Sequence, residues 1–227
     1  MGQARCNESY LESYGRLGEA ENVLRSVIQA AVNLGVNYVE ATVAKIAFDA
    51  SGTCLGVETT AGDIFTSKHT VLCAGARTAE LIAESAPENT ELQVNGRMTA
   101  AAAIMCAFRV PENKLHKFKN APIIVSPMGS TPGESIPPGE LGLVKCTHKL
   151  SFTHKVYHEA SKQTISVPPK RVTQSTWSQD VPEGLKNEVE ILRGKIYGSW
   201  IESLKPEYNR MYWFVIPSNS HAFSESC

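Results

Sequence analysis

The chain has 227 residues, of which 42% are hydrophobic and 20% charged, the composition of an ordinary globular protein. Its formal net charge of -1 comes without a long run of either sign, so neither nucleic acid nor a membrane surface is indicated as a partner. No stretch approaches ~18 consecutive apolar residues, so the sequence predicts no membrane-spanning helix.

The cysteines indicate the redox environment. Six cysteines lie far apart in the chain, without a Cys-x-x-Cys pair. Three of them, Cys73, Cys106 and Cys146, lie in apolar runs that resemble strands. Buried free thiols of this kind are typical of a reducing compartment rather than of a disulfide framework or a zinc site. We therefore expect a cytoplasmic protein, and the final residues Ser-Glu-Ser-Cys form no peroxisomal signal.

The first predicted helix covers residues 19–34, where apolar residues recur at i, i+3, i+4 and i+7 and predict one buried face. Gly35 follows as the left-handed residue that commonly ends a helix. The sequence then predicts a strand over 36–43, an antiparallel meander over 45–49, 54–59 and 63–67, and a buried parallel strand over 70–74. Gly75 ends that strand, and Thr78 is expected to cap the next helix.

From Gly96 onward the sequence is richer in strands. It predicts an apolar run over 98–110, a short strand over 122–127, a Pro/Gly-rich loop over 126–139, a strand over 141–153, a helix over 183–197 and an aromatic strand over 208–216. The expected fold class is α/β (α+β), with a partial Rossmann-like layer and an attached antiparallel sheet. A first βαβ unit is expected upstream of the first predicted helix, so the chain is expected to be incomplete.

Several segments, in this order, resemble the middle of the FAD-dependent amine oxidases of the D-amino-acid-oxidase-like group. They are Gly-Arg-Leu-Gly-Glu-Ala-Glu-Asn-Val-Leu (15–24), Ala-Thr-Val-Ala-Lys-Ile (41–46) and Thr-Val-Leu-Cys-Ala-Gly-Ala-Arg-Thr (70–78). Further on, residues 143–154 and Arg-Met-Tyr-Trp (210–213) resemble the fungal fructosyl amino acid oxidases (amadoriases) and saccharopine oxidases. The resemblance runs from Tyr14 to Trp213.

The resemblance implies both a domain organisation and a reaction. Residues 1–95 would be a partial FAD-binding domain, 96–205 a substrate-domain-like antiparallel sheet, and 206–227 a truncated return to the FAD-binding domain. The implied reaction is oxidation of the C–N bond of a secondary amine, such as an N-substituted or glycated amino acid. FAD would be the cofactor, the small-molecule amine and oxygen the partners, and hydrogen peroxide a product.

The resemblance also implies cofactor contacts at the turn that follows residues 70–74. Small residues there let backbone approach a dinucleotide closely, which would give contacts from Ala74, Gly75, Ala76 and Thr78. Val43 matches the position whose backbone meets the adenine. Taken alone, Ala-Gly-Ala is more often a plain strand-to-helix turn, and the order of the neighbouring elements is what favours the flavin.

Lys145 is the candidate catalytic residue. The resembling enzymes hold a lysine on this strand over the flavin, where its fixed positive charge helps oxygen to accept electrons. When Cys146 and Phe152 are matched to the family without a gap, Val144 instead occupies the position of the family's lysine. A shift of one residue along a strand moves a side chain to the opposite face of the sheet. The alternatives for Lys145 are therefore a catalytic lysine or a solvent-facing one.

Two departures from the family limit the expected activity. Tyr212 stands where many members have a cysteine bonded to the flavin ring, and neither it nor Met211 can form that bond. The chain also contains no two glycines spaced Gly-x-Gly, although this turn binds the pyrophosphate in the family. We expect the chain alone to bind FAD weakly and to have weak or no activity.

A second hypothesis is a non-catalytic remnant or interaction module of the same fold, with an exposed sheet edge that favours self-association. No metal site is predicted. His154 and His158 are four residues apart, but they lie at a strand end, where this spacing does not bring two side chains to one ion.

Overall fold

The computed structural model describes residues 20–126, 132–139, 141–148, 151–169, 181–201 and 203–218. The chain divides into two compact units. The sheet unit comprises Met1–Val36, Ala103–Ser151 and Arg171–Tyr212, and the meander unit comprises Asn37–Ala102, Phe152–Lys170 and Trp213–Cys227. The three-part domain division expected from the sequence stays a prediction.

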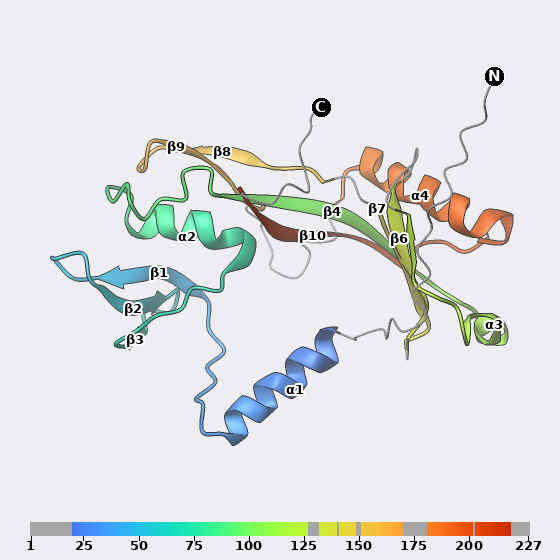
Figure 1. The fold of residues 1–227 in the computed structure, drawn as a ribbon, viewed down its shortest axis with the longest axis horizontal. Helices are drawn as coiled ribbons and strands as arrows, with labels where there is room; N and C mark the ends of the chain where they lie inside the picture. The colour runs from blue at the N-terminus through green and yellow to red at the C-terminus, as the bar shows by residue number, and fades with distance from the viewer. Residues whose placement is uncertain are drawn as a thin grey trace. The chain divides into compact units, whose positions relative to one another are not determined.

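The sheet unit is built on a five-stranded sheet with the strand order β10-β4-β7-β6-β5 (Figure 1). Its strands are β4 (Met98–Arg109), β5 (Ile124–Ser126), β6 (Gly133–Ile136), β7 (Leu143–His148) and β10 (Tyr208–Pro217). Residues 98–102 of β4 and 213–217 of β10 belong to the meander unit. The pairs β4–β7, β7–β6 and β6–β5 are antiparallel. The helices of this unit are α1 (Ala20–Asn33), α3 (Glu112–Leu115), α4 (Glu183–Tyr197) and the 3-10 turns η2 (His116–Phe118) and η3 (Gly198–Ile201).

Helix α4 covers one face of this sheet and completes its core. Phe108 of β4 is fully buried and meets the Tyr197 ring of α4 edge-on, with 5.7 Å between ring centroids. The backbone of β6 approaches the helix so closely that a Cβ on Gly133 would lie 2.4 Å from Leu192 Cδ2. Glycine at 133 therefore allows the sheet to pack against α4.

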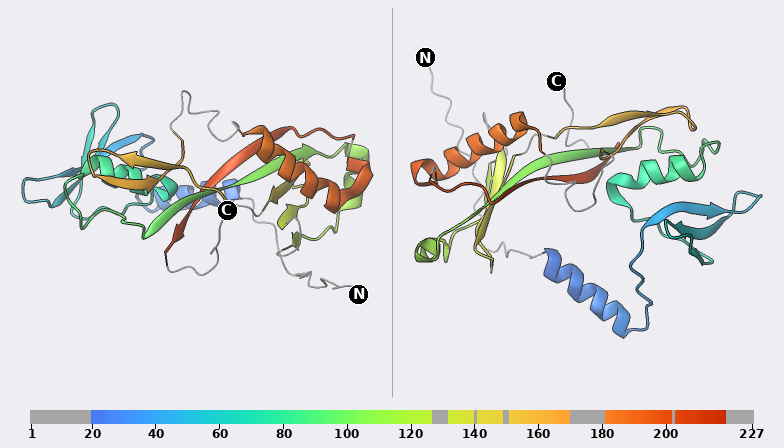
Figure 2. Two further views of the ribbon diagram at one scale, coloured as in Figure 1. Left: turned by 90° about the horizontal axis from the view of Figure 1, so that it is seen from above. Right: turned by 180° about the vertical axis from the view of Figure 1, so that it is seen from behind.

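The meander unit contains the antiparallel strands β1 (Val43–Phe48), β2 (Cys54–Thr59) and β3 (Ile64–Thr66), in that order. It also contains the turn η1 (Gly75–Arg77), helix α2 (Thr78–Ser85), and the hairpin β8 (Lys155–His158) and β9 (Gln163–Ser166), which lies beside α2 (Figure 2). The Ile46 N–H donates to Ser85 Oγ at 2.8 Å and ties β1 to α2. The unit's core is made of five buried residues: Ala79, Ala83, Val94, Ile165 and Val167.

The structure confirms the predicted fold class and several predicted elements. It confirms the three-stranded meander, the apolar strand that follows Gly96, the helix over 183–197 and the aromatic strand over 208–216. Gly35 has a φ of +93° after α1, as expected for a helix-ending glycine. Cys106 and Cys146 are buried thiols, as predicted.

Three predictions that depended on tertiary partners are wrong. Residues 36–42 and 70–74 form no strand, and Val71 is 85% exposed, because neither segment has a ladder partner among the described residues. Cys73 is consequently exposed rather than buried. Helix α1 forms, but none of its residues is buried, and Val23, Leu24 and Val27 of its apolar stripe are 56–61% exposed.

Three strands were not predicted. β6 lies inside the predicted Pro/Gly-rich loop, and the hairpin β8–β9 lies in a polar region for which the sequence predicts no element. Among the described residues, no helix is both long and apolar enough to cross a membrane.

We expect the buried His148 on β7 to make stability depend on pH. Burial lowers the pKa of His148 from its ordinary value near 6.5, although the Glu188 carboxylate at 4.0 Å opposes the shift. Below about pH 6.5 the unfolded chain binds a proton at this residue that the folded chain binds less well, so stability falls as the pH is lowered. Denaturant titrations between pH 7 and 5 should show this slope.

The matched variant is His148→Gln, in which the slope should become shallower whatever its effect on stability at pH 7. His116→Gln on the exposed turn η2 removes a histidine elsewhere and serves as the control. An unchanged slope in His148→Gln would contradict the assignment.

Candidate functional site

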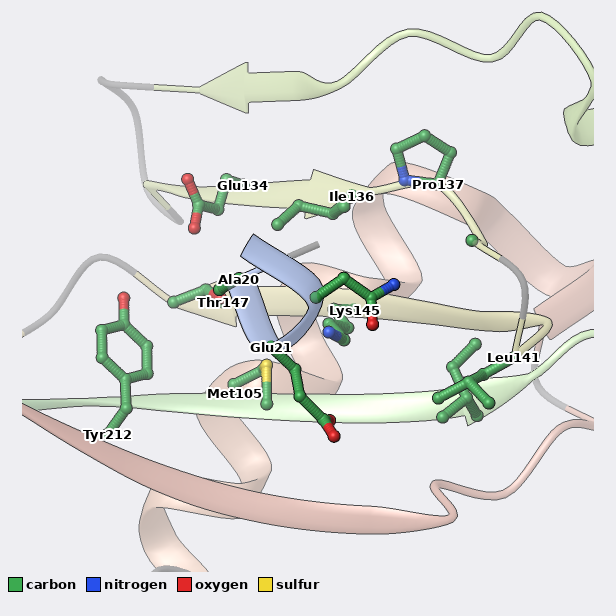
Figure 3. A pocket seen from close by; sticks show the side chains of 13 residues that line it. Ala20, Glu21, Met105, Glu134, Ile136, Pro137, Leu141, Lys145, Thr147 and Tyr212 are labelled. Carbon is green, nitrogen blue, oxygen red and sulfur yellow. The ribbon is translucent and has the colours of Figure 1, made fainter. Parts of the chain in front are cut away.

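The face of the sheet opposite α4 carries a hollow of about 530 Å³ (Figure 3). Side chains from four strands and from the first turn of α1 surround it. Its lining includes Met105, Glu134, Ile136, Lys145, Thr147 and Tyr212. All of them belong to the sheet unit.

The strand register explains why these residues share one face. Side chains alternate between the two faces of a strand, and directly paired residues lie on the same face. Thr147 pairs with Met105 on one side and with Glu134 on the other. Lys145 pairs with Ile136. The polar lining is thus a consequence of pairing among β4, β7 and β6.

Lys145 lies on the hollow side, where its side chain is exposed, whereas the neighbouring Val144 is fully buried on the α4 side. The two residues that the sequence left as alternatives therefore lie on opposite faces, and only Lys145 can meet a ligand in the hollow. Its catalytic role stays a prediction.

Glu134 and Tyr212 give the hollow a second polar region. Burial raises the pKa of the Tyr212 phenol, the negative charge of Glu134 adds to the shift, and a hydrogen bond with Thr147 opposes it. Glu134 is a diagonal neighbour of Lys145 across the β6–β7 pair, a separation of roughly 7–8 Å between backbones. Neither Glu134 nor Lys145 forms an ion pair with another described residue.

The hollow therefore presents a carboxylate from Glu134 and an ammonium group from Lys145 on one face of the sheet. The sequence analysis missed Glu134 because it lies in the segment predicted as a loop. The available signal was the short alternation over Gly133–Ile136, which is only four residues long and flanked by prolines.

The predicted cofactor-binding turn lies in the meander unit. Ala74 precedes η1, and Gly75 has a φ of +53°, a conformation that favours glycine. A Cβ on Gly75 would meet no atom within 4 Å, so the space beside this turn is open. Ala76 is partly buried, and Thr78 is 8% exposed in the first turn of α2.

Thr78 does not cap α2 as predicted. The helix begins at Thr78 itself, and Arg77 occupies the N-cap position without a capping hydrogen bond from its side chain. Instead, Arg77 pairs with Glu80 at 2.6 Å, which holds the first turn. The cap prediction failed because η1 extends the chain's helical conformation upstream of the threonine.

The turn leaves room for the close approach of a dinucleotide, because it is built of small residues and is open beside Gly75, which has a positive φ. Val43 begins β1 of the same unit and pairs with Thr59. Its contact with adenine, like the contacts of the turn, stays a prediction.

The two histidines weighed in the sequence serve the hairpin β8–β9. His154 Nδ1 lies 3.1 Å from the Val167 carbonyl oxygen, and His158 Nδ1 lies 2.8 Å from Ser161 Oγ. In the part of the chain that the structure describes, no group of three or more His, Cys, Asp or Glu residues could hold a metal ion.

The sequence matches no protein-family model and no curated protein. Solved structures do match. Amadoriase II, the fructosamine oxidase from Aspergillus fumigatus, has a TM-score of 0.71 at 20% identity, over 88% of this chain and 44% of that one. A modified fructosyl peptide oxidase from Aspergillus nidulans in complex with FSA has a TM-score of 0.72 at 22% identity, over 87% and 44%.

The fructosyl peptide oxidase from E. terrenum gives a TM-score of 0.70 at 19% identity, over 87% of this chain and 44% of that one. The chain therefore shares the fold of fructosyl amino acid and fructosyl peptide oxidases, and it spans less than half the length of each of these three structures. The fold expected from the sequence resemblance is confirmed at this level.

Proposed function

We propose that this chain has the substrate-binding face and part of the cofactor-binding region of an FAD-dependent oxidase that acts on the C–N bond of a secondary amine. The observation that carries the proposal is Lys145, whose ammonium group lines the hollow on the open face of a sheet shared with fructosyl amine oxidases. A glycated or otherwise N-substituted amino acid is the proposed substrate class.

Ala74, Gly75, Ala76, Thr78 and the backbone of Val43 would hold FAD. When bound, FAD would supply the hydride-accepting chemistry and the path of electrons to oxygen, with hydrogen peroxide as the product. Lys145 supplies a positive charge fixed on a strand, which stabilises the negative charge that develops as oxygen is reduced. Because the charge is in place before the reaction, no solvent must reorganise to provide it.

In this proposal Glu134 binds the positively charged end of the substrate. Its carboxylate lies on the face that carries Lys145, beside the hydroxyl-bearing Thr147 and Tyr212. A substrate ammonium would form a charge-assisted hydrogen bond there, and these bonds are among the strong ones.

Glu134→Gln should therefore raise the KM for a glycated amino acid roughly tenfold, the loss of about 1.4 kcal/mol expected when a charged hydrogen-bond partner becomes neutral. We expect kcat to change little, because the contact is made equally before and during the reaction. Peroxidase-coupled assays with FAD in excess give both constants.

The control for this variant is Glu58→Gln, which removes a partly exposed carboxylate from the meander unit and should leave KM unchanged. Equal KM values for the wild type and Glu134→Gln would exclude Glu134 from substrate binding.

Gly75→Asn should weaken FAD binding by about tenfold or more, that is, by at least ~1.4 kcal/mol. Asparagine tolerates positive φ, so the fold is kept, but its side chain enters the open space beside the turn. Quenching of flavin fluorescence during a titration of the chain measures the affinity. The wild-type chain itself should bind FAD weakly, since it has no Gly-x-Gly turn.

Gly62→Asn is the matched control, because Gly62 also has a positive φ, +89°, with no atom near its Cβ position. If both variants bound FAD as the wild type does, the turn at Gly75 would not be a flavin contact.

A further inference from the structure

Two thiols face each other on the α4 side of the sheet. Cys106 of β4 pairs directly with Cys146 of β7, and both are 0% exposed. Neither residue lines the hollow or has a part in the proposed oxidase reaction. Both are free thiols, and each contacts the other through a side-chain hydrogen bond.

The hydrogen bonds around β4 define the geometry of this pair. The Val110 N–H donates to the Gly142 carbonyl, which continues the register of β4 with β7. The Ala107 carbonyl instead accepts from the backbone N–H of Glu207, on the edge of β4 that faces away from β7. Even-numbered residues of β4 in this region therefore direct their backbone bonds toward β7, and Cys106–Cys146 is a hydrogen-bonded pair. Such pairs have Cα atoms ~5.5 Å apart, which lies in the usual range for a disulfide. Their Cβ atoms lie at the wide end of the ~4.5–5.5 Å cross-strand range, so closing the disulfide draws the two strands together by roughly 1 Å at this point.

Polar groups beside the pair favour ionisation of one thiol. The Cys146 thiol lies 3.6 Å from Ser135 Oγ. The hydrogen bond from Cys106 lowers the pKa of Cys146, and Ser135 and the Arg193 guanidinium of α4 add to the effect, against burial and the Glu190 carboxylate. A thiolate is the reactive form of cysteine in oxidation.

We propose that Cys106 and Cys146 are a redox-active dithiol that closes to a cross-strand disulfide when the protein meets hydrogen peroxide. The Cys146 sulfur attacks a peroxide oxygen, so an S–O bond forms, the O–O bond breaks and hydroxide leaves, taking up a proton to become water. The Cys106 sulfur then attacks the Cys146 sulfur, and a second water leaves with the thiol proton. Two thiols are oxidised, and one peroxide is reduced to two waters.

Burial makes this site selective for small oxidants. Both thiols are 0% exposed, so bulky thiol reagents do not reach them in the folded chain, whereas hydrogen peroxide is close to water in size. The disulfide would join β4 to β7 directly behind Lys145. The inference does not depend on the proposed oxidase activity, because the peroxide can be supplied from outside.

The test uses the full chain. Accessible thiols, including the exposed Cys73, are first blocked with iodoacetamide in the folded protein. Peroxide is then added and removed with catalase, and the chain is unfolded in N-ethylmaleimide and cut with trypsin. We expect most of Cys106 in a species that joins peptides 98–109 and 146–149 and separates after treatment with dithiothreitol.

Cys146→Ser should give no such species under the same treatment, and thermal unfolding shows whether this variant is folded. The proposal is overturned if wild-type Cys106 and Cys146 are recovered as maleimide-labelled thiols, if each is oxidised separately to a sulfinic or sulfonic acid, or if iodoacetamide labels them before peroxide is added. Loss of amine oxidation with the linked peptides present would count against the oxidase proposal alone.

Discussion

Replacing Lys145 with methionine is expected to lower kcat/KM for oxygen by about 10²–10³-fold, while kcat/KM for the amine changes far less. Removing one preorganised group that stabilises developing charge costs about 2.7–4 kcal/mol in the transition state. Methionine keeps the length of the side chain without its charge. Because Lys145 is exposed on the open face of β7, the substitution leaves the core next to it intact. Initial rates at varied oxygen concentration and saturating FAD measure the effect.

Two further variants make this result specific. Lys145→Arg keeps a positive charge at the same place and should recover part of the lost rate, and Lys155→Met removes an exposed lysine from β8 and should have no effect. A Lys145→Met chain that uses oxygen as well as the wild type does would show that this lysine has no catalytic role.

Replacing Phe108 with alanine is expected to lower the free energy of unfolding by about 3–5 kcal/mol, a large fraction of the ~5–15 kcal/mol that stabilises a typical domain. Phe108 is fully buried, packs edge-on against Tyr197 and lies 5.6 Å below the Arg193 guanidinium. Alanine would leave a cavity between β4 and α4, and it would remove both ring contacts.

Urea titrations of the two proteins measure this difference. Ile124→Ala is the control, since Ile124 lies on the strand at the edge of the same sheet and is 37% exposed. It should cost far less. A loss below about 1 kcal/mol for Phe108→Ala would contradict the packing of α4 on this sheet.

The elements that the sequence predicted well are those whose signals are local. In the meander, apolar and polar residues alternate along each strand, and turns at Gly52 and Gly62 separate the strands. Helix α4 has an apolar stripe and begins just after Pro182. Residues 36–42 and 70–74 have the same composition as strands but form none, because a strand requires a neighbour for its hydrogen bonds. α1 likewise has a stripe that no described residue buries.

The site was only partly predictable for the same reason. The resemblance indicated a lysine near residue 145, but only the pairing of β7 with β4 and β6 distinguishes Lys145 from Val144. Glu134 could not be placed, since β6 is a strand only because β5 and β7 flank it. In the sequence Tyr212 is only a departure from the family pattern, whereas in the structure its side chain lines the hollow.

The most direct test of the account is oxygen consumption by the purified chain with a glycated amino acid and excess FAD. We expect slow uptake that requires both the amine and FAD and yields one hydrogen peroxide for each oxygen consumed. Uptake should cease when either is omitted and should fall sharply in Lys145→Met. No amine-dependent uptake at any FAD concentration, or uptake that Lys145→Met leaves unchanged, would contradict the proposal that this face of the sheet is an amine oxidase site.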